Sequence, residues 1–172
     1  IGAALTADPR VAGVAFTGST ATARKIARAL LEDETRPIAP LIAETGGLNA
    51  MIVDSTALPE QVVADVITSA FRSAGQRCSA LRLLLLQEDV AERILQMLKG
   101  AMDALHIGDP LDARTDVGPV IDEAARDKLE TYRQSMKARW VHALTAPANN
   151  GLFVAPTIIR LEAIEDLRQE WF

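Results

Sequence analysis

Cys78, the single cysteine of the chain, is the residue with the clearest potential for chemistry. It lies after a helical pattern that Gly75 interrupts and before an apolar run. A loop between two regular elements presents a side chain on a rigid scaffold, and a thiolate is a strong nucleophile. Arg77 could favour the thiolate, although a neighbouring arginine can also point away. A small buried hydrophobe is the commoner use of a lone cysteine, so this pattern alone leaves both alternatives open.

Glu44 is a second candidate, because it ends an apolar run and precedes Gly46 and Gly47. A carboxylate at a strand end beside two glycines can lie where the backbone comes close to a ligand. A glutamate buried in such a cleft could act as a general base. A solvated loop glutamate is the more frequent case, so two alternatives remain here as well.

The turn Thr17-Gly18-Ser19-Thr20 joins an apolar run at 11–16 to a helical pattern at 21–32. A strand, a tight turn and a helix present free backbone N–H groups at the helix N-terminus, where a phosphate can bind. An ordinary turn in which Ser19 caps the helix is an equal alternative. The turn is not G-x-G-x-x-G, so the usual dinucleotide fingerprint is absent.

Strand and helix patterns alternate along the chain and predict an α/β fold with a mostly parallel sheet. Helices are expected at 1–5, 21–32, 59–71, 89–105 and 122–137, and strands at 11–16, 37–43, 50–53, 80–86, 140–144 and 153–159. The strand at 80–86 is apolar on both faces, which predicts a central place in a covered sheet. Pro37 and Pro40 place their strand at an edge or a bulge.

The composition limits the classes of function. The chain has 172 residues, 49% of them hydrophobic, and a formal net charge of −5. This length suits one domain or parts of two, and the charge argues against nonspecific binding of nucleic acid. One cysteine cannot form an internal disulfide, so a reducing, cytoplasmic location is expected. The apolar run at 83–86 is far too short to span a membrane. The chain starts without Met and ends without a polar tail, so we expect a piece of a longer protein.

A series of short motifs resembles the NAD(P)-dependent aldehyde dehydrogenase superfamily over essentially the whole chain. They are Phe16-Thr17-Gly18-Ser19-Thr20, Glu44-Thr45-Gly46-Gly47-x-Asn49, Gly75-Gln76-Arg77-Cys78, Gly108-Asp109-Pro110, Val117-Gly118-Pro119, Phe153-Val154-x-Pro156-Thr157 and Glu170-x-Phe172. Each is weak alone, but their common order is specific. The resemblance implies a fragment of the aldehyde dehydrogenase fold. Residues 1–45 would end a Rossmann-like NAD-binding domain, and residues 46–172 would form most of the α/β catalytic domain.

Two longer stretches, 43–55 and 73–82, resemble the L-glutamate γ-semialdehyde (1-pyrroline-5-carboxylate) dehydrogenase domain of bifunctional proline-utilisation proteins. This implies oxidation of that aldehyde to glutamate with NAD, while NADP stays open. FAD would belong only to a proline dehydrogenase domain outside this chain, in a parent protein that could associate peripherally with the inner membrane. Leu48 and Ala23 depart from the residues usual in the family, lysine and glycine, and could alter the fit of the cofactor.

The resemblance also implies roles for single residues. Cys78 would be the nucleophile, its backbone N–H would help to hold the oxyanion, and Glu44 would activate the hydrolytic water. The residues expected to contact the cofactor are Thr17, Gly18, Ser19, Gly46, Glu170 and Phe172, and those expected to contact the substrate are Ser79 and Arg77. No metal is implied.

Other functions stay open. The substrate could be another small aldehyde such as succinate semialdehyde, the chain could be a non-catalytic assembly module that keeps the fold, or Cys78 could sense redox state. In the family, an oxyanion-binding asparagine and the first cofactor-domain strands precede this segment, and further segments follow it. We therefore expect little or no dehydrogenase activity from the chain alone. Apolar edges of incomplete sheets would favour self-association.

Overall fold

The computed structural model describes all residues except 33, 35–36, 149–150, 168–170 and 172. The chain divides into two compact units, Ile1–Gly47 and Leu48–Phe172. Helices and strands occur in both units, so the predicted α/β class is confirmed. No helix in the described part of the chain is long and apolar enough to cross a membrane.

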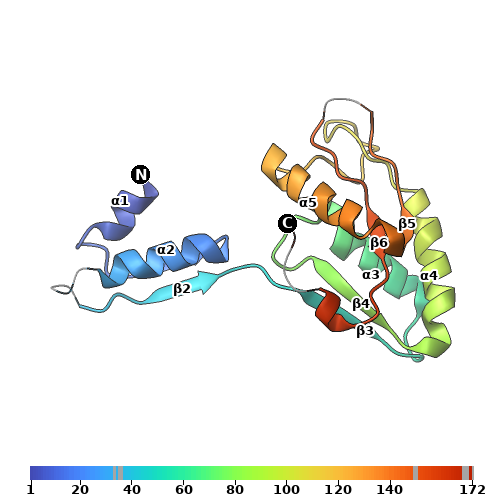
Figure 1. Ribbon diagram of the computed structural model, residues 1–172, viewed down its shortest axis with the longest axis horizontal. Coiled ribbons are helices and arrows are strands. Elements are labelled where there is room, and N and C mark those ends of the chain that lie inside the picture. The colour runs from blue at the N-terminus through green and yellow to red at the C-terminus, as the bar shows by residue number, and fades with distance from the viewer. Residues whose placement is uncertain (33, 35–36, 149–150, 168–170, 172) are drawn as a thin grey trace. The chain divides into compact units, whose positions relative to one another are not determined.

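The first unit is built on a strand–helix–strand motif, drawn in blue to cyan in Figure 1. Its elements are α1 (Gly2–Ala7), β1 (Val14–Thr17), α2 (Thr20–Leu31) and β2 (Leu41–Glu44). The two strands are parallel, and Thr17 at the end of β1 is in register with Glu44 at the end of β2. Parallel strands joined by a crossover helix therefore place both carboxyl ends at one edge of the sheet.

The second unit begins with another strand–helix–strand motif. Its elements are β3 (Asn49–Val53), α3 (Pro59–Phe71), the 3₁₀ turn η1 (Arg72–Gly75), β4 (Leu81–Leu86) and α4 (Glu88–Asp103). Pro59 starts α3 at the helix position that needs no N–H donor. The apolar faces of α3 and α4 pack on β3 and β4, with Ile94 and Met102 fully buried. This core supports the segment that carries Cys78.

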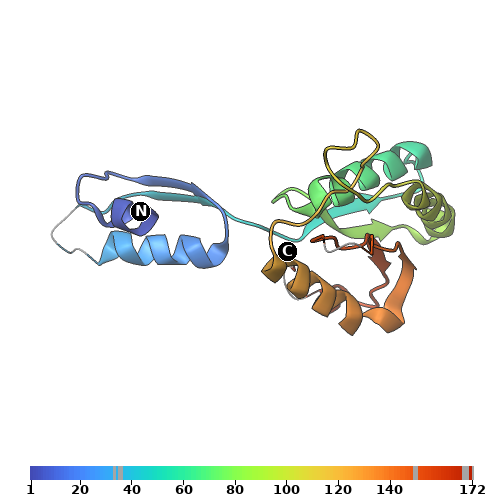
Figure 2. The same ribbon diagram turned by 90° about the horizontal axis from the view of Figure 1, so that it is seen from above.

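The remaining elements are α5 (Glu123–Ser135), η2 (Lys137–Arg139), β5 (Trp140–Ala143), β6 (Thr157–Ile159) and η3 (Ile164–Asp166). Strands β5 and β6 are antiparallel. Figure 2 shows α5 and this pair on the side of the β3–β4 sheet opposite to α3. Arg139 Nη1 donates to Asp166 Oδ2 at 2.5 Å, and this bond lowers the pKa of the Asp166 carboxyl.

The described strands form three two-stranded sheets, two parallel and one antiparallel, in place of the mostly parallel sheet expected. Among them, β4 pairs only with β3, so its predicted central position is wrong for this chain. Apart from Arg82 its residues are apolar and at least partly buried, and burial of both faces is a different property from having two neighbouring strands. Strand β2 begins only at Leu41, after both prolines, because proline lacks the N–H that a ladder requires.

Candidate active site

Cys78 lies on the turn between η1 and β4 and is exposed to solvent. The predicted loop position is thus confirmed, and the thiol is not a buried hydrophobe. The backbone reaches this turn through Ser73, Ala74 and Gly75, which have φ values of 57°, 51° and 70°. A left-handed conformation is unfavourable for residues with a Cβ, so the surrounding contacts must hold this path in place.

Two arginines hold the cysteine turn in place, one by binding the end of α3 and the other by binding η1. Arg77 Nη2 donates to the carbonyl oxygens of Thr68 and Ser69 at 2.9 and 3.0 Å. Arg82 Nη2 donates to the carbonyl of Gly75 at 2.5 Å. Cations suit the exposed carbonyls of a helix C-terminus. Arg77 therefore anchors the turn to α3, and a contact with substrate rests only on its position next to Cys78.

Two amide side chains tie the same turn to distant parts of the chain. Asn49 Nδ2 donates to the carbonyl oxygens of Cys78 and Ala80 at 2.7 and 2.9 Å. Gln76 Oε1 accepts from the backbone N–H of Ile121 at 2.8 Å. The sequence motifs include both amides, but sequence reasoning assigned neither a role, nor one to Arg82. A polar side chain at the start of an apolar strand was the signal available for Asn49.

Gly75→Ala is expected to destabilise the chain by about 1–3 kcal/mol, because the new Cβ would sit in a left-handed conformation. That Cβ would also lie 2.8 Å from the carbonyl oxygen of Ala70. Gly100→Ala is the matched control, since a Cβ there, inside α4, meets nothing within 4 Å. Urea denaturation at pH 7 measures both, and the control should be neutral or slightly stabilising. Equal free energies of unfolding for the two variants would contradict the left-handed path.

The first unit brings together four of the predicted site residues. Thr17 pairs with Glu44, and the Gly18 N–H donates to the Glu44 carbonyl at 3.1 Å. Ser19 caps α2, since its Oγ accepts from the Thr22 N–H at 3.2 Å. The cap alternative is therefore confirmed, and it leaves the remaining first-turn N–H groups as donors for a ligand. The first turn of α2 carries no acidic residue that would repel an anion.

Other predicted residues lie apart from this edge. Gly46 follows β2 and is exposed, as is the Glu44 side chain, so the burial considered for that carboxylate is absent from this unit. Ser79 is exposed next to Cys78 in the second unit. Glu170 and Phe172 lie outside the described residues.

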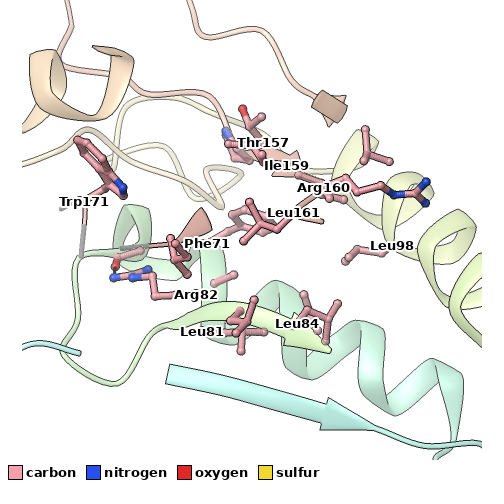
Figure 3. A pocket seen from close by; sticks show the side chains of 18 of the residues that line it. Phe71, Leu81, Arg82, Leu84, Leu98, Thr157, Ile159, Arg160, Leu161 and Trp171 are labelled. Carbon is pink, nitrogen blue, oxygen red and sulfur yellow. Dashed lines mark hydrogen bonds between the residues drawn. The ribbon is translucent and has the colours of Figure 1, made fainter. Parts of the chain in front are cut away.

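A cavity of about 680 Å³ lies between β4 and the segment around β6 (Figure 3). Its walls are mainly apolar side chains, among them Leu84 and Leu98, while Arg82 and Trp171 border one end. Trp171 stacks on Tyr132 at 4.5 Å, and burial raises the pKa of the Tyr132 hydroxyl. Cys78 does not line this cavity.

Known proteins match this arrangement and this sequence. The model of the aldehyde dehydrogenase family matches residues 1–172. The bifunctional protein PutA of Salmonella typhimurium is 52% identical over 184 aligned residues, which cover all of this chain and 14% of that protein. The chain therefore spans about a seventh of the length of this curated relative.

Solved structures match as well. A mutant of Bradyrhizobium japonicum proline utilization A superposes with a TM-score of 0.93 at 58% identity, covering 99% of this chain and 18% of that one. A 1-pyrroline-5-carboxylate dehydrogenase from Thermus with bound NAD superposes with a TM-score of 0.82 at 31% identity, covering 92% of this chain and 31% of that one.

Proposed function

The chain belongs to the aldehyde dehydrogenase family, and from this premise we propose that it supplies the nucleophile and the hydrolytic base of an NAD-dependent 1-pyrroline-5-carboxylate dehydrogenase. The parent enzyme would oxidise L-glutamate γ-semialdehyde to glutamate. The observation that carries the proposal is an exposed Cys78 on a turn that side-chain hydrogen bonds tie to three other segments, in a chain 52% identical to a PutA protein. Succinate semialdehyde is the alternative substrate.

Cys78 is proposed to attack the aldehyde. Its thiolate would form a C–S bond with the carbonyl carbon while the carbonyl electron pair moves to oxygen. No described residue accepts a hydrogen bond from the Cys78 N–H, so this donor is available for the oxyanion. A preorganised N–H donor stabilises the charge that develops in the transition state. Ser79 and Arg77 flank Cys78 in the sequence, and we propose that they contact the substrate.

The turn at Thr17, Gly18 and Ser19 is proposed to hold the pyrophosphate of NAD. The positive end of α2 and its free first-turn N–H groups suit an anion, and no acidic side chain opposes it. NAD, when bound, would accept the hydride that the carbon attached to Cys78 loses, which leaves a thioester. Gly46 is a further proposed cofactor contact, as are Glu170 and Phe172.

Glu44 is proposed to complete the reaction. Its carboxylate would take a proton from a water molecule that attacks the thioester carbon. The C–S bond then breaks, the carboxylic acid leaves and the Cys78 thiolate is restored. A base that acts on water needs contact with solvent, and the exposed Glu44 side chain meets that condition.

The two compact units match two proposed domains. We propose that residues 1–45 belong to the NAD-binding domain and residues 46–172 to the catalytic domain, which agrees with a division of the chain after Gly47. Self-association and a cytoplasmic location stay predictions. Ile52 on β3 is 80% exposed, and such a side chain favours burial against a further surface.

A segment exchange tests the proposed function. The matching segment of the Salmonella typhimurium protein is replaced by this chain, and NADH formation from 1-pyrroline-5-carboxylate and from succinate semialdehyde is recorded. We expect activity with 1-pyrroline-5-carboxylate within about tenfold of the unaltered host, because the two segments share half of their residues. The controls for folding are elution of the chimera as the same assembly as the unaltered host and unfolding at the same urea concentration. A folded chimera without dehydrogenase activity would favour the assembly-module alternative.

A further inference from the structure

Asn49 makes a contact with the nucleophile segment that the proposed mechanism does not use. It is the first residue of β3 and is half-buried, and its amide donates to the carbonyls of both Cys78 and Ala80. We infer that Asn49 is a positioning residue for Cys78, which fixes the direction of the thiol and the neighbouring N–H donor. This inference rests on the proposed function, in which Cys78 is the nucleophile.

The two peptide planes that flank a residue set the direction of its Cα–Cβ bond, because each plane is rigid. The plane before Cys78 is held through the Arg77 carbonyl, which accepts from the Ala80 N–H at 3.0 Å and from Arg82 Nη2 at 3.4 Å. The plane after Cys78 is held through its own carbonyl by Asn49 Nδ2 at 2.7 Å. Both planes around the thiol are therefore fixed, the second one by Asn49.

Asparagine suits this position for reasons of geometry and charge. Its NH₂ group carries two donors and can serve two carbonyls at once without bringing in a charge. A carboxylate of the same shape would instead face two carbonyl oxygens. The ladder between β3 and β4 shifts its register between Asn49 and Ala50. Such a shift in register changes the direction of a side chain. Here it occurs next to Asn49, whose amide binds carbonyls of the cysteine turn.

Two reagents that act on Cys78 separate positioning from mere folding. Alkylation by iodoacetamide depends only on the thiolate. Attack on p-nitrophenyl acetate, in which the thiolate forms a thioester and p-nitrophenolate leaves, is in addition accelerated by a donor for the oxyanion. Because the chain has one cysteine, a Cys78→Ala chain gives the background reaction of its histidines, lysines and N-terminal amine, and subtracting that background leaves the rates of Cys78. The measurement uses the 172-residue chain without NAD, so it does not depend on dehydrogenase activity.

The compared variants are Asn49→Asp, Asn49→Ser and the control Gln96→Glu. The control makes the same amide-to-acid change at an exposed position of α4. We expect both Asn49 variants to lower the ratio of the ester rate to the iodoacetamide rate by about tenfold or more, while the control leaves it unchanged. The serine variant adds no charge, and its single, shorter O–H cannot serve both carbonyls, so a lowered ratio there shows that loss of the amide causes the change.

An unchanged ratio in a folded Asn49 variant would overturn the inference. The inference would also be overturned if the unaltered chain had a ratio no higher than that of N-acetylcysteine. Failure of both Asn49 variants to fold would overturn it as well, because Asn49 would then be needed for folding. The segment exchange separates this from the proposed function. A chimera that is fully active with Asn49→Ser would leave the function standing without the inference. A lowered ratio beside an inactive chimera would leave the inference standing without the function.

Discussion

Cys78→Ser in the segment-exchange chimera is expected to lower the steady-state formation of NADH by at least about a thousandfold, because a serine hydroxyl without an adjacent base is a poor nucleophile. The substitution exchanges one atom at an exposed side chain, so it should leave the free energy of unfolding within about 0.5 kcal/mol. A loss of activity at constant stability would therefore report on chemistry.

Ser79→Ala is the neighbouring control for that result. Ser79 is exposed on the same turn, and none of its atoms takes part in the proposed bond changes. We expect its effect on kcat to be at least a hundredfold smaller than that of Cys78→Ser, within the roughly tenfold range of a contact that does not react. Substantial NADH formation by the Cys78→Ser chimera would refute the assignment of Cys78 as the nucleophile. It would favour the redox-sensor or the assembly-module alternative.

Glu44→Gln is expected to separate the two halves of the reaction. Without the base, the first turnover should still form NADH and a thioester on Cys78. Hydrolysis should then slow by about 10²- to 10⁴-fold, the contribution typical of a positioned general base. Stopped-flow absorbance would show a burst close to one NADH per site followed by a slow phase. Mass spectrometry would show an acyl group on the chain.

Glu32→Gln is the matched control in the same unit. Glu32 is exposed at the end of α2 and lies away from the carboxyl edge that Glu44 shares with Thr17. This control should keep both the burst and the steady rate. A Glu44→Gln chimera that loses the burst as well would place Glu44 in an earlier step, and one with the full steady rate would remove it from the mechanism.

Sequence periodicity predicted the local motifs well, since a helix or a strand is decided largely by nearby residues. The helix that starts at Pro59 and the exposed turn with Cys78 illustrate this. Strand 153–159 was predicted too long, because only Thr157–Ile159 meets a partner strand. The pairing of strands depends on residues far apart in the sequence, so an apolar run does not show which of its residues will meet a partner strand.

The order of motifs by itself predicted the family of this chain, and it singled out Cys78 and Glu44 as the proposed reactive side chains, because the chemistry available to a residue depends on its type. Only the tertiary structure decided what holds Cys78 in place. Asn49 lies 29 residues away in the sequence, and Gln76 binds a backbone group 45 residues away. Arg77, adjacent to the thiol in sequence, instead binds the end of α3. Hydrogen-bond partners are fixed by where folding brings donors and acceptors together, and sequence neighbourhood carries little of that information.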